Sequence, residues 1–353
     1  MGHCACERPE REYELDTRGF FSTRSTRATM LSDTLTKSPH PELITKLQKT
    51  FPENTSITEI PYYQFNQLLS TYTELQPTLQ EIASYYDNET PIPTLNDSSS
   101  LIKINPLHIC NTKTDEEQYI DCYLNSQGEI TGIGTILTQN GNFYKGEFKN
   151  NVFNGLGFFI NGNGDFYYGT WENGESCGKG DLRMKNGAHY SGEFKHNQKN
   201  GHGEETYEDG SYYVGDFVNN VKEGKGRIEF NDGSIYTGEF KGGKMHGKGL
   251  YQWNDGRFYN GEFEDGKIQG KGKFKYQDGS VYNGYYVDNK KNGNGVYSWI
   301  DGKKYVGFWK EDSPEGEGSY DIGGKKYEAM YKDGKVVERN VDNDNSNSNS
   351  NIN

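Results

Sequence analysis

The residues best suited to chemistry stand at the start of the chain, which reads Met-Gly-His-Cys-Ala-Cys. Gly2 occupies the position that N-myristoylation modifies, and Cys4 and Cys6 are close enough for palmitoylation of the same segment. One myristoyl chain binds a membrane marginally, whereas a second signal makes attachment stable. Residue 6 is Cys where the common pattern has Ser or Thr. Two interpretations of Gly2, Cys4 and Cys6 stay open: an acyl anchor, and an unmodified terminus whose cysteines are incidental.

The same terminus does not predict a metal site, because His3, Cys4 and Cys6 lack a fourth ligand and the cysteine spacing typical of zinc sites. The sequence contains no Gly-x-x-x-x-Gly-Lys-Ser/Thr phosphate loop, no His-Glu-x-x-His pair and no Cys-x-x-Cys pair. Ser, His and Asp occur, but no spacing groups them as a catalytic set. We therefore expect no metal, no cofactor and no enzymatic activity.

Composition argues against several classes of partner and location. The net charge is −13 and the mean hydropathy is −0.98. This acidic balance disfavours nucleic acid, because phosphate contacts need a basic surface, and it weakens direct binding to anionic lipid. The five cysteines are odd in number and unevenly placed, which disfavours a disulfide framework. No apolar run reaches the roughly 18 residues of a membrane span, so we expect a cytoplasmic protein.

A repeat of 23 residues organises most of the chain. A Gly-x-Gly triplet begins at residues 132, 155, 178, 201, 224, 247, 270, 293 and 316. A second series in the same register has Tyr, then Gly two places on, then an aromatic residue four places on. A fixed period of this length indicates a stacked array rather than a globular enzyme domain. The defining pairs include Tyr144 and Gly146, Tyr190 and Gly192, Tyr236 and Gly238, Tyr259 and Gly261, and Tyr282 and Gly284.

Each repeat is expected to form a β-hairpin. In residues 249–263, two runs of alternating apolar residues flank Asp255-Gly256. An Asp-Gly pair in this setting predicts a type I′ turn, and residues 263–272 are then the connection to the next hairpin. The Gly within Tyr-x-Gly-x-Phe removes a side chain between two aromatic residues on one face, so that a neighbouring ring lies across the backbone.

The pattern Tyr-x-Gly-x-Phe/Trp, then Gly-x-Gly, then Asp-Gly at 23 residues resembles the MORN (membrane occupation and recognition nexus) repeat. The resemblance covers residues 118–331, about nine to ten units. The terminal units, around Tyr119 and Tyr327, keep the aromatic residues but lose the Gly, as capping repeats do. Family members often have His before the Gly-x-Gly, and here only His246 fits. The resemblance implies a non-enzymatic protein in cytoskeletal or ciliary settings such as the radial spoke of the axoneme.

The predicted fold is an all-β repeat array, an elongated twisted antiparallel sheet of tandem hairpins, with a mostly irregular, partly helical N-terminal segment. Leu43, Ile44 and Leu47 predict one short helix, and the spacing from Phe65 to Leu75 predicts a second. The expected division is a flexible arm over 1–40, short helices over 41–90, a linker over 91–117, the array over 118–331 and a disordered Asn/Ser tail over 332–353.

The second face of the sheet is polar in the central repeats and apolar toward both ends. Two interpretations stay open for the apolar ends: coverage by the chain's own termini, or docking surfaces for a protein partner or a second copy. The N-terminal set is Phe158, Ile160 and Tyr168, and the C-terminal set is Tyr285, Val296, Val306 and Phe308.

The sequence therefore predicts a non-catalytic scaffold that docks proteins in a cytoskeletal or ciliary assembly. The alternative is an acyl-anchored adaptor at the cytoplasmic face of a membrane. A third interpretation, direct phosphoinositide binding, rests on a row of lysines inside the Gly-x-Gly triplets, Lys225, Lys248 and Lys271, with Glu residues nearby.

Overall fold

The computed structural model describes residues 41–49, 55–60, 62–71, 101–104, 106–111 and 116–340. The described chain divides into two compact units. The first contains the described residues up to Glu208 together with Val218–Asn220, and the second contains Asp209–Phe217 and the chain from Val221 onward. No helix in the described part is long and apolar enough to cross a membrane.

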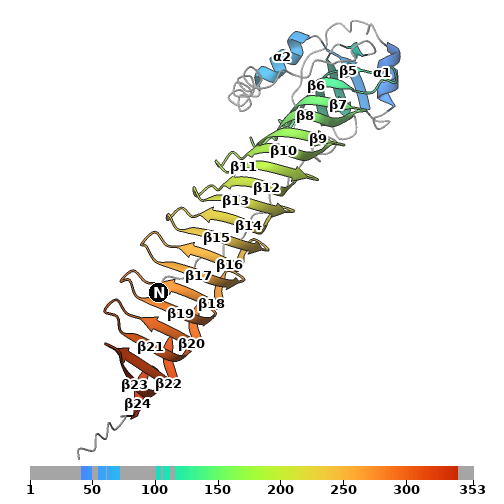
Figure 1. The fold of residues 1–353 in the computed structure, drawn as a ribbon. Helices are drawn as coiled ribbons and strands as arrows, with labels where there is room; N and C mark the ends of the chain where they lie inside the picture. Colours follow the sequence, from blue (N-terminus) through green and yellow to red (C-terminus); the bar gives the residue numbers. More distant parts are fainter. Residues whose placement is uncertain are drawn as a thin grey trace, which may run out of the picture. The chain divides into compact units, whose positions relative to one another are not determined.

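The first unit is a sheet of antiparallel hairpins. Strands β6 to β12 pair in chain order, and β1, β3 and β4 extend this sheet ahead of β6 (Figure 1). Strands β2 and β5 form a separate pair. The strands are β1 (Thr55–Glu59), β2 (Ile102–Lys103), β3 (Leu107–Asn111), β4 (Glu116–Asp121), β5 (Tyr123–Leu124), β6 (Gly132–Thr138), β7 (Phe143–Lys149), β8 (Val152–Ile160), β9 (Phe166–Glu172), β10 (Glu175–Arg183), β11 (His189–Lys195) and β12 (Gln198–Thr206).

The N-terminal segment of this unit differs from the prediction in part. Helices α1 (Pro41–Gln48) and α2 (Tyr62–Thr71) lie where two helices were expected. Between them, however, β1 pairs with β3, so residues 41–90 are not helical alone, and β3 and β4 occupy part of the expected linker. A short strand beside a longer sheet gains its hydrogen bonds from the neighbour, which local sequence does not reveal.

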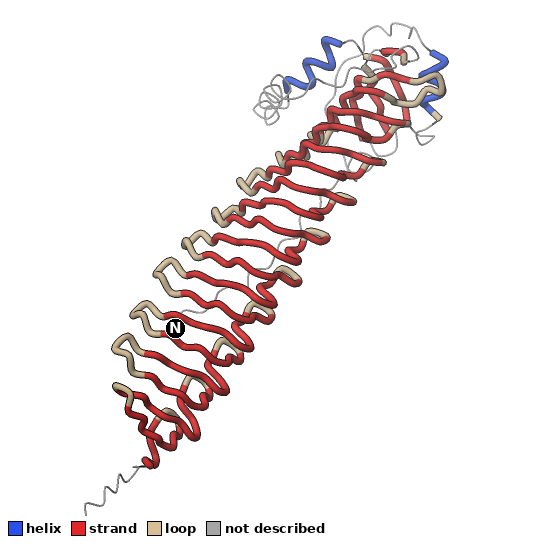
Figure 2. Tube along the Cα trace, viewed as in Figure 1, coloured by secondary structure: helices blue, strands red, loops and turns tan. Residues whose placement is uncertain are grey.

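The second unit repeats the same construction. Strands β14 to β24 pair antiparallel in chain order, and β13 belongs to the second unit except for its last residue (Figure 2). The expected tail over 332–353 begins with a strand, β24, rather than with irregular chain. The strands are β13 (Tyr212–Val218), β14 (Val221–Glu229), β15 (Ile235–Lys241), β16 (Lys244–Gln252), β17 (Phe258–Glu264), β18 (Lys267–Lys275), β19 (Val281–Val287), β20 (Lys290–Ser298), β21 (Lys304–Lys310), β22 (Ser313–Ile322), β23 (Lys325–Lys332) and β24 (Lys335–Asn340).

The two turns of each repeat are the reverse of the prediction. At Asp255-Gly256 only the Gly has positive φ, 88°, and its N–H donates to Trp253 O at 3.1 Å. This matches a type I turn followed by a left-handed glycine. The type I′ geometry lies at the other connection, where Asp265 and Gly266 have φ of 49° and 80°. Residues 263–272, expected to be a connection, are therefore mostly strand, because a two-residue turn suffices to join the strands.

The glycines of the repeat make room for a tyrosine ring. A Cβ on Gly146 would lie 2.6 Å from Tyr144 Oη, and one on Gly157 would lie 2.7 Å from Tyr144 Cζ. The ring thus covers a cross-strand pair of glycines, and its hydroxyl donates to Glu147 O at 2.9 Å. The prediction that a ring lies across the glycine backbone is confirmed, and the ring belongs to the same repeat.

These tyrosines form a ladder with the aromatic residue four places on, along the face that we call the inner face. Tyr236 meets Phe240 of its own repeat and Phe263 of the next, both edge to face, at 5.2 and 5.1 Å. Such pairs are favourable beyond the area that they bury. The ladder tyrosines are fully buried, so the array is held by rings rather than by an aliphatic core. They are Tyr144, Tyr167, Tyr190, Tyr213, Tyr236, Tyr259, Tyr282 and Tyr305.

Candidate binding surfaces of the repeat sheet

The N-terminal docking set does not form an open surface in the structure. Phe158 and Ile160 are each 1% exposed and belong to a core cluster with Leu137, Phe143 and Phe166. Leu68 of α2, Tyr119 of β4 and Tyr168 pack against this cluster. The interpretation that the chain's own N-terminal segments cover this end therefore fits the structure, and Phe158 and Ile160 are core residues.

The C-terminal docking set lies on the face opposite the tyrosine ladder, which we call the outer face. Tyr285, Val306 and Phe308 are 49%, 47% and 42% exposed, and Val296 is half-buried. Tyr285 and Phe308 lie on β19 and β21, on either side of β20. Val296 of β20 pairs directly with Val306. The structure thus brings these four residues together, and we call them the outer patch.

In other repeats, the positions of the two outer-patch rings hold glutamates that accept a backbone hydrogen bond. At the repeat position of Tyr285 and Phe308, Glu147 accepts the N–H of Leu156 at 3.1 Å, and Glu239 accepts that of Lys248 at 3.2 Å. Phe308 has no acceptor atom for this hydrogen bond, and no backbone N–H donates to the Tyr285 hydroxyl in the described part of the chain. The exposed rings of Tyr285 and Phe308 therefore do not provide the support that a glutamate gives there.

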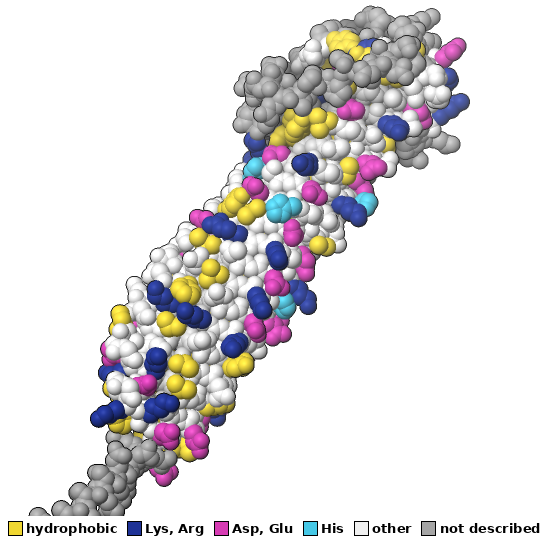
Figure 3. All heavy atoms as spheres, viewed as in Figure 1, with side chains coloured by type: hydrophobic (Ala, Val, Ile, Leu, Met, Phe, Trp, Pro, Cys, Tyr) yellow, Lys and Arg dark blue, Asp and Glu magenta, His cyan; other side chains and the backbone are white. Residues whose placement is uncertain are grey.

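Charge surrounds the apolar side chains on the visible surface. Figure 3 shows hydrophobic side chains in small groups among Lys, Arg, Asp and Glu side chains. The lysines of the Gly-x-Gly triplets are exposed, and in register Lys225 faces Glu239 and Lys248 faces Glu262. Lys271 faces Tyr285 instead. Because glutamates face most lysines of this row, the row attracts anionic lipid only weakly.

The inner face carries a second aromatic row beside the ladder. In the second unit this row is half-buried, and its rings contact one another in sequence, for example Trp253 with Phe274 at 5.2 Å and Tyr276 with Tyr297 at 5.6 Å. In the first unit, the same repeat positions hold two rings, Phe159 and Tyr207, among non-aromatic side chains such as Leu182, Met184 and Glu205. Half-buried rings are therefore more frequent in the second unit, where they include Phe230, Trp253, Phe274, Tyr276, Tyr297, Trp299 and Tyr320.

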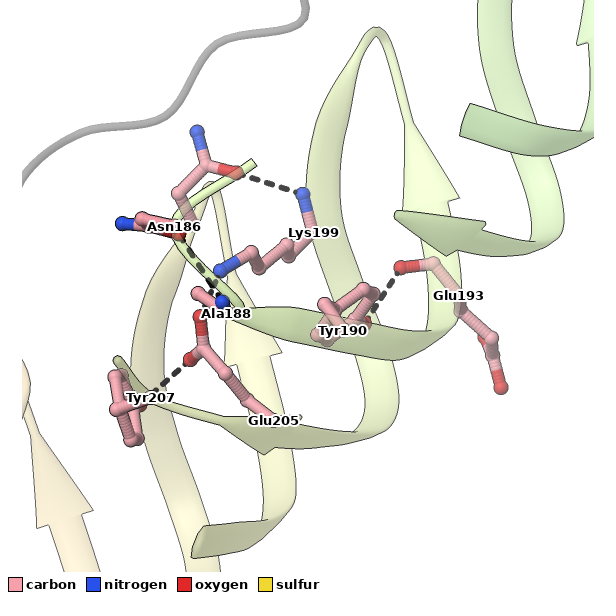
Figure 4. Close-up of polar contacts among 8 residues, drawn as sticks. Asn186, Ala188, Tyr190, Glu193, Lys199, Glu205 and Tyr207 are labelled. Carbon is pink, nitrogen blue, oxygen red and sulfur yellow. Dashed lines mark hydrogen bonds and ion pairs between the residues drawn. The ribbon is translucent and has the colours of Figure 1, made fainter. Parts of the chain in front are cut away.

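The residue two places before the Gly-x-Gly lies against the ladder tyrosine nine places before it in several repeats. In the first unit, Phe153 stacks on Tyr144 at 3.7 Å, and Trp171 beside it donates its indole N–H to Gly157 O at 3.2 Å. At the same repeat position, Lys199 lies 5.2 Å from the Tyr190 ring centroid. Figure 4 shows the polar contacts around this lysine.

Lys199 is neutralised within the chain. Its ammonium pairs with the Glu205 carboxylate, and Tyr207 donates its hydroxyl to the other Glu205 oxygen at 2.6 Å. Both members of the pair are less than one-tenth exposed. A buried cation is tolerated when a carboxylate and further hydrogen bonds satisfy it, so we call this set the closed lysine site.

Lys291 occupies the same repeat position with different surroundings. Its Nζ lies 4.7 Å from the Trp309 ring centroid, 5.3 Å from that of Tyr297 and 5.7 Å from those of Tyr276 and Tyr282. Burial lowers the pKa of Lys291 from its usual 10.5, and the Asp312 carboxylate opposes this shift. Its one side-chain hydrogen bond in the described structure is a long one, 3.4 Å, to Tyr276 Oη.

Two further polar groups beside Lys291 have no partner in the described part of the chain. They are the hydroxyl of Tyr286, which is the cross-strand neighbour of Lys291, and the indole N–H of Trp309. These side chains are 4% and 5% exposed, and burial raises the pKa of Tyr286, so its hydroxyl remains a donor. We call Lys291, Tyr276, Tyr286 and Trp309 the open lysine site.

Sequence reasoning did not single out this position. It holds Phe153, Ser176, Lys199, Lys222, Met245, Ile268, Lys291 and Pro314, so no residue type marks it. The signal that was present is a lysine at a position that several other repeats fill with apolar side chains. The predicted acylation residues Gly2, Cys4 and Cys6 lie outside the described residues. Among the described residues, no group of three or more His, Cys, Asp or Glu could hold a metal ion.

Comparison with protein families identifies the repeat. The MORN repeat profile matches eight consecutive segments that together span half of the chain: residues 144–166, 167–189, 190–212, 213–235, 236–256, 259–281, 282–304 and 305–323. The chain therefore belongs to the MORN-repeat family.

No curated protein sequence matches the chain significantly. Among solved structures, the TCP domain of Drosophila melanogaster SAS-4, in complex with a proline-rich motif of Ana2, is 13% identical, covers 44% of this chain and 85% of its own, and has a TM-score of 0.29. The TCP10 domain of Danio rerio CPAP is 14% identical, with coverages of 56% and 90% and a TM-score of 0.30. The G-box domain of the microcephaly protein CPAP is 10% identical, with coverages of 57% and 100% and a TM-score of 0.32. Similarity at this level supports no conclusion about function.

Proposed function

We propose that this MORN-repeat protein is a non-catalytic scaffold that docks other proteins in a cytoskeletal or ciliary assembly, as in a radial spoke. The observation that carries the proposal is the outer patch of the second unit. Tyr285, Val306 and Phe308 are each more than two-fifths exposed, and the two rings replace a carboxylate that supports the backbone in other repeats.

The chemistry of the patch favours a protein partner. Exposed aromatic side chains are enriched at protein interfaces, where they bury a large area with few rotatable bonds. The adjoining polar surface, including Lys271 opposite Tyr285, supplies a rim of charge around the apolar centre. A second copy of the chain is the other occupant with this chemistry, which would make the protein a homodimer.

The test is localisation of the full chain in its own cell type. The chain is tagged at its C-terminus, and a Tyr285→Ser, Phe308→Ser version is compared with the wild type. We expect the wild type to mark a cytoskeletal or ciliary structure and the double variant to disperse through the cytoplasm. Tyr327→Ser is the matched control, because Tyr327 is also exposed, at 53%, but lies on β23 outside the patch.

Two results would contradict the proposal. If the double variant decorates the same structure as the wild type, the outer patch does not dock the scaffold. If sedimentation shows that the purified wild type dimerises and the double variant is monomeric, while both localise alike, the patch joins copies of the chain instead.

The acyl terminus supports a second candidate, a peripheral adaptor at the cytoplasmic face of a membrane. Gly2, Cys4 and Cys6 offer one myristoylation site and two palmitoylation sites. A Gly2→Ala, Cys4→Ser, Cys6→Ser version separates the two functions. Release of this version from a membrane that the wild type lines supports the adaptor, whereas unchanged decoration of a cytoskeletal structure supports the scaffold.

A further inference from the structure

The closed and open lysine sites differ in the side chain six places after the lysine; a third lysine at this repeat position, the buried Lys222, has Ile228 there. In the closed site, the carboxylate that meets Lys199 comes from Glu205 on the same strand, six residues on. The residue at that place in the repeat of Lys291 is Tyr297. Among the described residues, no carboxylate oxygen lies within ion-pairing distance of Lys291 Nζ. The Asp312 carboxylate lies beside Lys291, but its Oδ1 accepts the backbone N–H of Lys291 at 2.9 Å and no ion pair joins it to the ammonium.

The open lysine site also contains hydrogen-bond donors that have no acceptor or only a distant one. The ammonium of Lys291 has three protons and one long hydrogen bond. The Tyr286 hydroxyl and the Trp309 indole N–H are buried and unpartnered. Buried polar groups are usually satisfied, so two unpartnered buried donors beside a half-buried ammonium call for an explanation. By contrast, the indole of Trp171, at the repeat position of Trp309 in the first unit, is bonded to Gly157 O.

The open lysine site therefore lacks a negatively charged hydrogen-bond acceptor. The side chains around the site indicate which kind of molecule supplies this acceptor. Half-buried rings flank the open site on the inner face, among them Trp299 next along the row from Tyr297. They suit a carboxylate carried by a peptide with apolar neighbours. A polyanion such as nucleic acid, or an anionic membrane, is disfavoured by the net charge of −13.

We propose that the open lysine site binds a carboxylate of a partner protein, an Asp, a Glu or a C-terminus, which takes the place that Glu205 holds in the closed site. The carboxylate pairs with the Lys291 ammonium and accepts hydrogen bonds from Tyr286 and Trp309. This inference rests on the proposed scaffold role but concerns the inner face, because adjacent residues such as Tyr285 and Tyr286 point to opposite faces of a strand.

The experiment titrates the purified full chain with sodium acetate, against sodium chloride at equal ionic strength, and follows two nuclear magnetic resonance signals. These are the indole N–H of Trp309, assigned by its loss in Trp309→Phe, and the side-chain signals of Lys291, assigned by their loss in Lys291→Met. We expect acetate to shift both signals along one saturation curve. Met is a fair replacement because Met245 stands at the same repeat position.

Variants decide where acetate binds. We expect Lys291→Met and Tyr297→Glu each to weaken the acetate response at least tenfold, the first by removing the cation and the second by supplying an internal carboxylate. The matched control, Lys271→Met, removes an exposed lysine from the outer face and should leave the response unchanged.

Each contrary outcome overturns the proposal in a different way. If acetate moves neither signal, or moves Trp309 equally in Lys291→Met, the open site does not bind a carboxylate. If inorganic phosphate saturates the same signals at a lower concentration than acetate, the site is a general anion site. Failure here leaves the outer patch untouched, since Tyr285 and Phe308 are tested by localisation.

Discussion

The clusters around Phe153 and Lys291 occupy the same positions of the repeat, one in each unit. Phe153 lies among Tyr144, Phe148 and Trp171, and Lys291 lies among the matching residues Tyr282, Tyr286 and Trp309. The first cluster is closed, because rings fill it and the indole of Trp171 is hydrogen-bonded. In the second cluster, the ammonium of Lys291 occupies the position of the Phe153 ring. Tyr286 occupies the position of Phe148 and carries a hydroxyl that Phe148 lacks.

This comparison separates the part of the repeat that builds the sheet from the part that can vary. Ladder tyrosines and paired glycines are present in both clusters, with the Tyr hydroxyl bonded to a carbonyl three residues on. The position two places before the Gly-x-Gly takes Phe, Ser, Met, Ile, Pro or Lys. A repeat protein can therefore place one specific site in a chosen repeat while the neighbouring repeats keep the array folded.

The largest expected effect comes from breaking what the two clusters share. We expect Tyr144→Ala and Tyr259→Ala each to lower the free energy of unfolding by about 3–5 kcal/mol, because each removes a fully buried ring and uncovers a glycine pair. Urea denaturation measures the loss, with the exposed Tyr285→Ala as a control. A loss under about 1 kcal/mol for both would show that the ladder does not hold the sheet.

A second prediction concerns pH, because the ladder tyrosines must stay protonated. Burial raises the pKa of Tyr190, Tyr259 and Tyr282 above the ordinary 10, and it raises that of Tyr305 to about 12. A phenol whose pKa is raised in the folded state contributes stability that is complete below pH 10 and is lost as the pH rises toward the folded value. Circular dichroism should show steep unfolding above about pH 10. A denaturation midpoint that is flat from pH 9 to 12 would contradict the burial of these rings.

A smaller effect separates the two clusters. We expect Lys291→Met to raise the free energy of unfolding by about 1 kcal/mol at pH 7, because it removes a cation that burial disfavours. The pKa of Lys291 is lowered in the folded state, so the wild type gains stability as the pH rises toward 10.5, the unfolded value. The advantage of the Met variant should therefore shrink from pH 7 to pH 10.

Denaturation of the wild type and of Lys291→Met at several pH values measures this difference in unfolding free energy. The titration of the tyrosines is common to both proteins and cancels in the difference. The charged and titratable groups that face Lys291 are Asp312, Tyr276, Tyr282, Tyr286 and Tyr297, and all are retained in the variant. A Met variant that is less stable than the wild type at every pH would show that the ring contacts outweigh the cost of burying the ammonium.

The smallest effect is expected at the outer patch. Tyr285→Ser and Phe308→Ser should change the free energy of unfolding by no more than about 0.5 kcal/mol each, because both rings are largely exposed. Thermal denaturation checks this expectation. A loss of several degrees in the melting temperature would mean that the patch supports the sheet, and dispersal of the double variant in cells could then reflect unfolding.

The sequence predicted the period, the strands and the inner face because these repeat, so that one assignment holds for every unit. It reversed the two turns, since Asp265-Gly266 and Asp255-Gly256 are the same dipeptide and only the strand register distinguishes them. It did not anticipate the pairing of β1 with β3 or of β3 with β4, because β1 and β3 lie outside the repeat.

The candidate surfaces were predictable to different degrees. The alternation of residues along a strand was enough to group Tyr285, Val306 and Phe308, but not to show that Leu68 and Tyr119 cover the matching end near Phe158. The open lysine site could not be predicted, because it is defined by a missing carboxylate. Glu205 pairs with Lys199 in one repeat, whereas the matching residue in the repeat of Lys291 is Tyr297.

The central claim is that Lys291 is a cation without its carboxylate, and a double-mutant cycle between Lys291→Met and Tyr297→Glu tests it directly. Unfolding free energies of the four proteins give the coupling, in which the cost of losing the Tyr297 ring cancels. If Glu at 297 completes the site as Glu205 does for Lys199, the coupling should be favourable by about 1–3 kcal/mol at pH 7 and should disappear at pH 3. A coupling within about 0.3 kcal/mol of zero would contradict the claim.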